Sequence, residues 1–212
     1  MQLPEHVFHI AEASNWPSIE RQGLLPADAL LERAHPGEVA LARKHRPKHT
    51  VLPTGVHIRD QAPMPEKALA SCLVGMVPPQ WYALVNAHVF FWLDPRRLNR
   101  QRAACGPRPQ VVATVRTADL LSHHGKAVYV TPFNIGYALR KPARRGVATL
   151  VPYATWLESG WSTETAAMGG SVRSRAHAPA ELLVRGPISA FLSMVCSVTR
   201  LEPGSQFVPS DA

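Results

Sequence analysis

The chain has 212 residues, of which 46% are apolar, which is enough for one substantial hydrophobic core but short for two. Its formal net charge of +8 and pI near 9.9 favour a polyanionic partner such as nucleic acid, although arginine that is simply common on solvated faces would give the same balance. No stretch approaches about 18 uninterrupted apolar residues and the N-terminus lacks a signal-peptide pattern, so we expect no membrane span and a cytoplasmic protein.

The first predicted unit is a strand followed by a short helix. Val7 to Ile10 reads as a strand, and Ser14 or Asn15 is expected to cap a helix that has Pro17 in its first turn and ends at Gly23. His9 would then lie at the end of a strand beside a helix N-terminus, which favours anionic groups. By itself this pattern more often marks a core histidine.

Short elements follow, because 20 prolines and 13 glycines divide the rest of the chain. We expect helices over 27–34, 66–73 and 118–122 and from 78 onward, strands over 56–63, 87–93, 110–115, 126–130, 149–151, 181–184 and 191–201, and a mobile loop bordering the active site over 160–175. This mixture predicts an α+β fold with a mixed, mostly antiparallel sheet and short flanking helices. We expect one domain over 1–205 and a polar tail over 206–212.

Three basic runs, over 43–49, 96–102 and 140–145, concentrate the positive charge. Such runs attract phosphates by releasing counterions. Five basic residues of the first run and of the polar 160–175 stretch are predicted to contact nucleic acid: Arg43, Lys44, Lys48, Arg173 and Arg175.

Glu181 opens a late apolar strand. A charge near a core strand is costly unless it has a partner or a function, so this carboxylate is a candidate catalytic group. The alternative is a glutamate on an edge strand that faces solvent. The three cysteines, Cys72, Cys105 and Cys196, are widely spaced and form no C-x-x-C pair, so we expect buried thiols, no disulfide framework and no metal site.

Two stretches resemble the ADP-ribosyltransferase superfamily, especially the DarT-like enzymes that modify DNA bases and the related RNA 2′-phosphotransferases. They are the opening from His9 to Leu25, with Trp16-Pro17-Ser18-Ile19 at its centre, and the strand Ala180-Glu181-Leu182-Leu183-Val184. The opening is closer still to bacterial proteins of unassigned function that share His-x-Ala-Glu-Ala-x-x-Trp-Pro-Ser-Ile, so the resemblance does not name a substrate.

The resemblance implies a single-domain ADP-ribosyltransferase-like fold that uses NAD as the ADP-ribose donor. It implies catalytic roles for Glu181 and Arg46 and cofactor contacts by His9, Ile10, Ala11, Gly23, Arg59, Tyr82 and Phe90. Either Arg46, as first choice, or Arg59 would neutralise the NAD diphosphate. Tyr82, Phe90 or Trp92 would stack on the nicotinamide ring, although core packing is the commoner fate of such aromatic residues.

The hypothesis is therefore an NAD-dependent mono-ADP-ribosyltransferase that modifies a nucleobase in DNA or RNA, as a toxin with an antitoxin partner or as a phage-defence effector. Three alternatives stay open: a protein ADP-ribosyltransferase, an RNA 2′-phosphotransferase and a noncatalytic nucleic-acid-binding module. Kinase and hydrolase functions are disfavoured, because the sequence has no P-loop, no H-E-x-x-H and no G-x-S-x-G motif.

Overall fold

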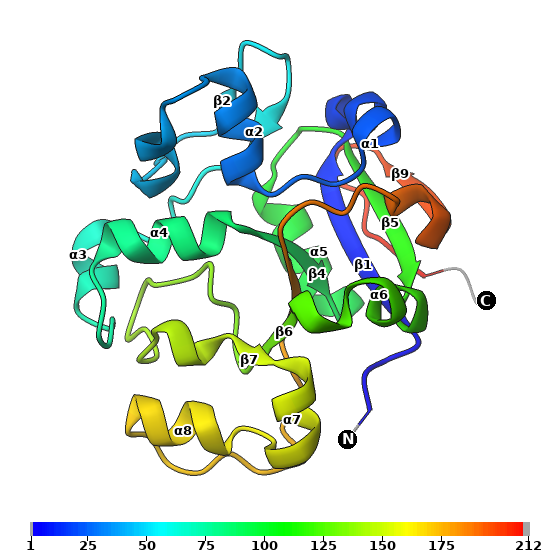
Figure 1. Ribbon diagram of the computed structural model, residues 1–212. Helices are drawn as coiled ribbons and strands as arrows, with labels where there is room; N and C mark the ends of the chain where they lie inside the picture. The colour runs from blue at the N-terminus through cyan, green and yellow to red at the C-terminus, as the bar shows by residue number, and fades with distance from the viewer. Residues whose placement is uncertain (1, 210–212) are drawn as a thin grey trace.

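The computed structural model describes residues 2–209, which form one seven-stranded sheet with helices on both faces (Figure 1). The strand order is β7-β6-β8-β4-β1-β5-β9, and every neighbouring pair is antiparallel. These strands are β1 (His6–Glu12), β4 (His88–Trp92), β5 (Gln110–Arg116), β6 (Val128–Thr131), β7 (Val151–Pro152), β8 (Glu181–Arg185) and β9 (Val195–Leu201). A separate hairpin joins β2 (Thr50–Val51) and β3 (His57–Ile58). The predicted α+β fold with a mostly antiparallel sheet is confirmed.

The helices are short, as the proline and glycine content predicts. They are α1 (Trp16–Gln22), α2 (Ala27–Ala34), α3 (Glu66–Ala70), α4 (Pro78–Asn86), α5 (Pro95–Ala104), α6 (Thr117–His124), α7 (Tyr153–Ser159) and α8 (Ser162–Met168). Single turns of 3₁₀ helix lie at Ala13–Asn15, Val39–Arg43, Gly125–Ala127, Val147–Thr149 and Phe191–Met194.

The side chains of alternate strand residues pack on opposite faces of the sheet. On one face Val89, Phe91, Leu182 and Val184 join a large cluster with residues of α1, α6 and α7. The other face carries two separate clusters. One gathers around α3 and α4, and the other packs α5 against β1 and β5. The two clusters leave a gap on this face, and Glu181 lies in it.

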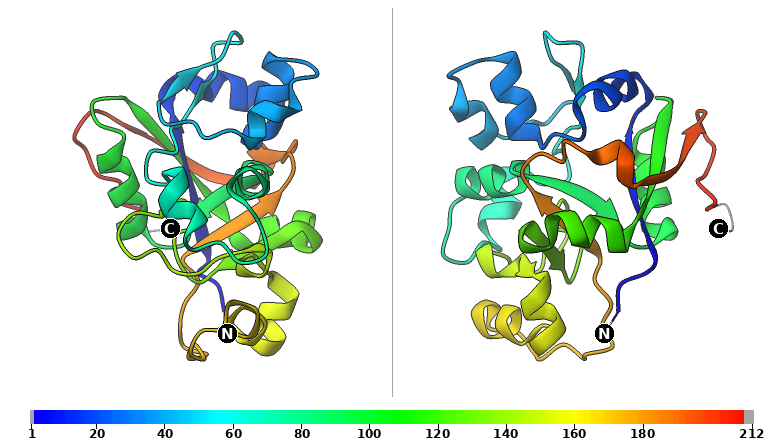
Figure 2. Two further views of the ribbon diagram at one scale, coloured as in Figure 1. Left: turned by 90° about the vertical axis from the view of Figure 1, so that its left-hand side faces the viewer. Right: turned by 45° about the vertical axis from the view of Figure 1, so that its right-hand side comes forward.

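A fourth, smaller cluster packs α2 against the β2–β3 hairpin and the 3₁₀ turn Val39–Arg43. This unit lies beside the end of α4, as both views of Figure 2 show. Asn15 fixes the hairpin to the sheet, because its side-chain amide donates to the carbonyl of His57 and accepts from the N–H of His57, both at 2.8 Å. The prediction that Asn15 or Ser14 caps α1 is therefore wrong, since no side-chain cap is formed.

Gly23 ends α1 as predicted, and the structure gives a second reason for glycine there. Its φ is +76°, and a Cβ would lie 2.2 Å from the carbonyl oxygen of Ile188. This close approach lets Leu24 exchange two backbone hydrogen bonds with Ile188, which follows β8. The helix is thereby joined to the strand that carries Glu181.

Several local predictions are corrected. The polar stretch 160–175 is not a loop throughout, because α8 occupies its first half and buries Glu164, Thr165 and Met168. The strand expected over 56–63 is reduced to β3, and the last strand begins at Val195 because a 3₁₀ turn precedes it. Cys196 is exposed, since it lies on the edge strand β9.

The expected polar tail begins with a packed residue. Phe207 is 2% exposed and packs edge-to-face on Phe8, with ring centroids 5.2 Å apart. Asn99 holds it from both sides, accepting from its N–H and donating to its carbonyl. The packed chain therefore extends at least to residue 207, while residues 210–212 of the expected tail lie outside the described part.

Candidate active site

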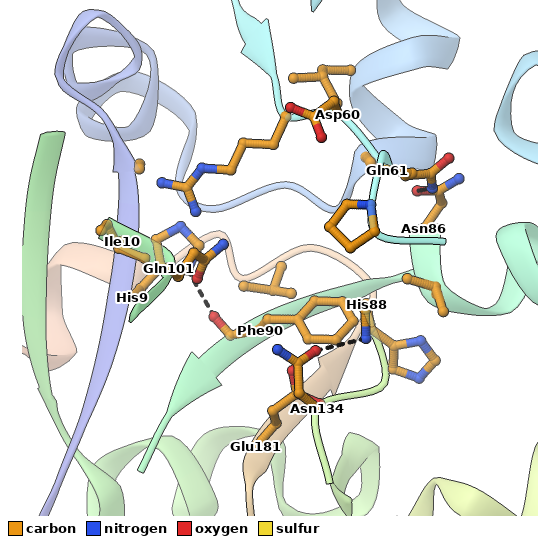
Figure 3. A pocket seen from close by; sticks show the side chains of 18 of the residues that line it. His9, Ile10, Asp60, Gln61, Asn86, His88, Phe90, Gln101, Asn134 and Glu181 are labelled. Atoms are coloured by element: carbon orange, nitrogen blue, oxygen red, sulfur yellow. Dashed lines mark hydrogen bonds between the residues drawn. The ribbon is translucent and has the colours of Figure 1, made fainter. Parts of the chain in front are cut away.

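A cavity of about 900 Å³ opens where the two clusters on one face of the sheet leave their gap. Its walls are formed by β1, α1, the segment 56–64, β4, α5 and the loop 133–145. Figure 3 shows the ring of Phe90 in this space, with His9 on one side and Asn134 and Glu181 on the other. Residues from distant parts of the chain thus meet in one place.

The strands β1 and β4 separate at the cavity. Among the described residues β1 forms seven residue pairs with β5 but one with β4, Phe8 opposite Trp92. Beyond that pair the imidazole of His9 lies between the strands, with Nδ1 2.9 Å from the carbonyl oxygen of Phe90 and its ring centroid 5.7 Å from that of Phe91. The hydrogen bond of the His9 side chain therefore takes the place of the next backbone hydrogen bond between β1 and β4.

This position fixes the protonation of His9. A carbonyl oxygen can only accept, so Nδ1 carries the hydrogen and donates it to Phe90. Burial lowers the pKa of His9 to about 4 against the opposing effect of that hydrogen bond, and the positive charge of Arg59 lowers it further. The ring is neutral at pH 7, and no described residue hydrogen-bonds to Nε2, which is therefore available to accept a hydrogen bond from a ligand hydroxyl in the cavity.

Glu181 is the first residue of β8 and lies opposite Trp92 on β4 and Thr131 on β6. It is 4% exposed and belongs to an interior strand, so the edge-strand alternative is wrong. Burial raises the pKa of its carboxyl to about 7. Oε2 accepts hydrogen bonds of 3.0 Å from the N–H of Ile135 and the hydroxyl of Thr131, while no described residue hydrogen-bonds to Oε1.

Thr131 has one hydroxyl hydrogen but two acceptors, each 3.0 Å away: Oε2 of Glu181 and the carbonyl oxygen of Phe133. The ionised carboxylate therefore competes with a backbone carbonyl for this hydrogen. A proton on Glu181 removes the competition, because the carboxylic acid can donate to the threonine oxygen. The hydrogen bonds from Ile135 and Thr131 still favour the ionised carboxylate, so burial, the larger effect, accounts for the raised pKa of Glu181.

Arg46 lines the same cavity and has few partners. Its Nη2 donates to the side-chain oxygen of Asn86 at 3.0 Å, whereas Nε and Nη1 are buried without a hydrogen-bond partner. No carboxylate of the described residues lies within 4.0 Å of this guanidinium, and burial lowers its pKa to about 10. An unpaired buried cation is costly, and an anionic ligand would supply the missing acceptors.

Arg59 differs from Arg46 because it already has partners. Its Nη2 donates to the Gln110 side chain at 2.6 Å, and its Nε lies 3.9 Å from the buried carboxylate of Glu12. Glu12 also pairs with Arg108 at 3.1 Å and accepts from Gln110 at 2.6 Å. Both candidates for the diphosphate arginine line the cavity, but of the two only Arg46 has buried nitrogens without a hydrogen-bond partner.

The loop 133–145 closes the cavity beside Glu181. Asn134 accepts from the N–H of Gly136, and Ile135 contributes the N–H that Glu181 binds. The loop ends at Arg145, which is 1% exposed, donates to the carbonyl of Ile135 at 2.9 Å and lies 5.1 Å from the ring centroid of Phe133. In the sequence Arg145 is part of a basic run, and nothing in that run marks it as buried.

The remaining predicted residues divide into two groups. Ile10, Ala11, Gly23 and Phe90 line the cavity, whereas Tyr82 does not. Tyr82 is 1% exposed, donates to the carbonyl of Met64 and stacks on His45, so it packs in the core around α4.

None of the five residues predicted to bind nucleic acid lines the cavity. Arg43, Lys44 and Lys48 lie on the exposed stretch that follows α2. Arg173 forms a two-point ion pair with the buried Glu164, and Arg175 donates to the carbonyl of Glu158. Contact of these residues with nucleic acid stays a prediction.

The cations that do line the cavity were mostly missed. Eight arginine and lysine residues face three carboxylates there: Arg46, Arg59, Arg97, Arg100, Arg108, Arg140, Lys141 and Arg145 against Glu12, Asp60 and Glu181. Helical spacing could have found part of this set, because Arg97, Arg100, Gln101 and Ala104 recur every three or four residues along α5 and share one side of it. The lining is thus suited to an anionic ligand.

Residues 5–195 match a family described as "Family of unknown function (DUF7002)". The chain belongs to the DUF7002 family. No curated protein matches this DUF7002 chain. Among solved structures it is similar to Thermosipho africanus DarTG in complex with ADP-ribose, at 12% identity and a TM-score of 0.45, over 92% of this chain and 43% of that one. A likeness at this level does not establish an activity, and the DUF7002 chain spans less than half of that chain's length.

Two features are absent from residues 2–209 of the DUF7002 chain. No helix there is long and apolar enough to cross a membrane. Over the same residues, no group of three or more histidine, cysteine or acidic side chains is arranged to hold a metal ion.

Proposed function

We propose that this protein is an NAD-dependent ADP-ribosyltransferase whose active site is the cavity between β1 and β4. The observation that carries the proposal is that His9, Arg46 and Glu181, from three distant parts of the chain, line one cavity with unsatisfied polar atoms. The volume of about 900 Å³ lies in the upper part of the range of about 300–1,000 Å³ that is usual for small-molecule sites. The sequence resemblance of the His9 and Glu181 stretches to ADP-ribosyltransferases supports the same conclusion.

NAD enters this proposal as a substrate. Arg46 would donate from Nε and Nη1 to the diphosphate, since these two nitrogens lack acceptors in the protein. The neutral His9 would accept a hydrogen bond from a ribose hydroxyl at Nε2, and the ring of Phe90 would stack on the nicotinamide. Arg59 would contribute mainly charge, because its Nη2 donates to Gln110 and its Nε faces Glu12.

The proposed reaction breaks the bond between C1′ of the ribose and the nicotinamide nitrogen. The bonding electrons leave with nicotinamide, which becomes neutral, and positive charge develops on the ribose in an oxocarbenium-like transition state. Glu181 stabilises this charge with its carboxylate. A nucleophile of the acceptor then forms the new bond to C1′, and its proton passes to Glu181.

The raised pKa of Glu181 suits this double role. A carboxyl with a pKa of about 7 is substantially ionised at neutral pH and yet basic enough to take a proton from the acceptor. An ordinary surface carboxylate would be ionised but a much weaker base. The same environment that makes Glu181 costly to bury therefore makes it useful as a base.

The proposal is tested by incubating the protein with NAD labelled in its adenine part, together with separate pools of single-stranded DNA, RNA and protein. Transfer of label to one pool supports the proposal and identifies the class of acceptor. The matched control is Glu181→Gln, which keeps the side-chain shape and loses the charge. Label transfer by this control at the wild-type rate, or no thermal stabilisation of the wild type by millimolar NAD, would count against it.

The same assay separates the alternatives. Label found only in the protein pool favours a protein ADP-ribosyltransferase. Release of a 2′-phosphate from an RNA splice junction, with that phosphate transferred to NAD, would identify an RNA 2′-phosphotransferase. Nucleic-acid binding without any effect of NAD would identify a noncatalytic module.

A further inference from the structure

The loop 133–145 has a buried side and an open side. Ile135 and Ala138 are fully buried, and the N–H of Ala138 donates to the carbonyl of Pro63 at 2.7 Å. Tyr137 and Leu139 instead are 43% and 38% exposed, although both are large and apolar and both line the cavity. An aromatic ring left open at the mouth of a cavity is a ready surface for a planar ligand group.

Two cations adjoin these exposed side chains. Arg140 and Lys141 are exposed, line the cavity and form no ion pair or hydrogen bond with any described residue. Their φ angles are +47° and +51°, a region that residues other than glycine seldom occupy. Backbone held in such a conformation tends to occur at binding sites, because the surrounding structure must maintain it. Here the buried Ile135 and Ala138 provide that support.

The loop is also connected to the candidate catalytic carboxylate. The N–H of Ile135 donates to Oε2 of Glu181, and the side chain of Arg145 donates to the carbonyl of Ile135. The open residues are therefore two to six positions from the one that contacts Glu181. A molecule held by the open side lies at the entrance to the reacting centre.

We propose that Tyr137–Lys141, which we term the rim segment, binds the acceptor of the reaction, and that the acceptor is a single-stranded nucleic acid. An unpaired base stacks on the ring of Tyr137, and the neighbouring phosphates pair with Arg140 and Lys141. This rests on the function proposed above and adds to it the acceptor and the residues that recognise it.

The chemistry of the rim favours this acceptor over a protein. Proteins that bind single strands combine aromatic rings, on which bases stack, with cations that follow the backbone. The rim segment has both within five residues, beside a cavity lined by eight cations and three carboxylates. A paired base has no free face to stack on Tyr137 and could not enter the cavity, so an unpaired strand is required.

Binding is measured by fluorescence anisotropy, with a labelled single-stranded DNA of roughly 12 nucleotides, the RNA of the same sequence and the DNA duplex as probes. Tyr137→Ala should weaken binding of the single strand about tenfold, and Tyr137→Phe, which keeps the ring, should bind like the wild type. The duplex should bind more weakly than the single strand to the wild type. Comparison of the DNA and RNA arms identifies the sugar.

Salt dependence tests the two cations. Arg140→Gln with Lys141→Gln should lower the slope of log affinity against log salt by about 1.4, since each contact with a single strand contributes about 0.7. The matched control is Lys126→Gln with Arg200→Gln, which removes two exposed cations that do not line the cavity, and its slope should stay that of the wild type.

Three results would overturn the rim proposal: Tyr137→Ala binding as tightly as the wild type, equal slopes for the rim and control variants, or loss of the slope in Arg43→Gln with Lys44→Gln instead. Absence of all oligonucleotide binding, with label transferred to protein, would also overturn it and favour a protein acceptor. Stabilisation by NAD is measured on the wild type and on Tyr137→Phe, which keeps the ring, and should be present in both. Failure of NAD to stabilise even the wild type would contradict the proposed function, whereas loss of oligonucleotide binding alone contradicts only the rim proposal.

Discussion

Replacing Glu181 by glutamine should make the protein more stable at neutral pH and nearly inactive. The amide keeps the size of the side chain, and its oxygen can still accept the hydrogen bonds from Ile135 and Thr131. What it removes is a negative charge held away from water. If Glu181 served only to stabilise the fold, its replacement by glutamine would instead make the protein less stable.

The magnitude follows from the pKa of Glu181, which burial raises from 4.5 to about 7. At 1.36 kcal/mol per pKa unit this difference corresponds to about 3 kcal/mol. The native protein holds the proton more tightly than the unfolded chain does. Glu181 therefore contributes its full stability below pH 4.5, and this contribution is lost as the pH rises to about 7. The glutamine variant does not titrate, so its advantage over the wild type should grow by about 3 kcal/mol across that window.

The free energy of unfolding is measured by urea denaturation of both proteins at pH values spanning the window, together with the rate of transfer from NAD. We expect the rate to fall on the order of 10²-fold or more, a size typical of one acid–base group. Glu164→Gln is the control, since Glu164 is equally buried but pairs with Arg173 and lies outside the cavity, so that its loss should destabilise the protein. A stability difference between Glu181→Gln and the wild type that does not change with pH would refute the reasoning.

Three further predictions concern the other residues of the site. His9→Gln should lose most of the thermal stabilisation by NAD, and an unchanged NAD effect would remove His9 from the binding site. Because burial lowers the pKa of His9 to about 4, the contribution of His9 to the stability of the wild type should fall as the pH drops from 6.5 through about 4. The wild type should therefore lose stability relative to the variant over that range, since the opposite contribution of Glu181 is common to both proteins. Arg46→Gln should abolish most of the NAD stabilisation without lowering the melting temperature of the free protein. Arg59→Gln should lower that temperature, because the buried carboxylate of Glu12 loses a cation. Equal NAD effects in both variants would contradict the different roles proposed for the two arginines. Gly23→Ala should destabilise the protein by more than about 2 kcal/mol, because its Cβ would lie 2.2 Å from backbone. The control is Gly186→Ala, at φ +82° with nothing within 4 Å, which should cost about 1–2 kcal/mol. Equal urea midpoints for the two variants would be evidence against the close contact at Gly23.

The sequence could predict those parts of the site that lie on regular strands and close turns. Glu181 is conspicuous because it opens an apolar strand, and Gly23 because a glycine at a helix end has a conformational reason. His9 is a candidate only through the resemblance of its stretch to ADP-ribosyltransferases, since the strand pattern alone marks a core histidine. The helix Ala27–Ala34 was predicted with its observed bounds for the same reason, since proline and glycine frame it.

The rest depends on contacts between distant residues, which local pattern does not encode. The burial of Arg145 comes from Trp81 and Phe133, and the pairing of Arg59 comes from Glu12, which lies 47 positions earlier in the chain. Tyr82 is on a helix whose apolar face could have met either a ligand or the core, and His45 and Met64 decide for the core. Helix α8 was missed because its polar composition is typical of a loop, and the Glu164–Arg173 pair that makes burial tolerable is formed only in the fold.

The separation of β1 from β4 divides the sheet into two groups of strands. One group is β1, β5 and β9, and the other is β4, β8, β6 and β7. The pair of Phe8 with Trp92 and the bond from His9 to Phe90 are the sheet contacts described between them. This junction has fewer residue pairs than the ladder between β1 and β5, so without a ligand we expect amide hydrogen exchange to be faster at the junction than in that ladder. Arg46, His9 and Glu181 do not all lie on the same side of this division. A molecule bound to all three in the cavity would therefore connect the two groups, and amide hydrogen exchange would slow in both groups at once.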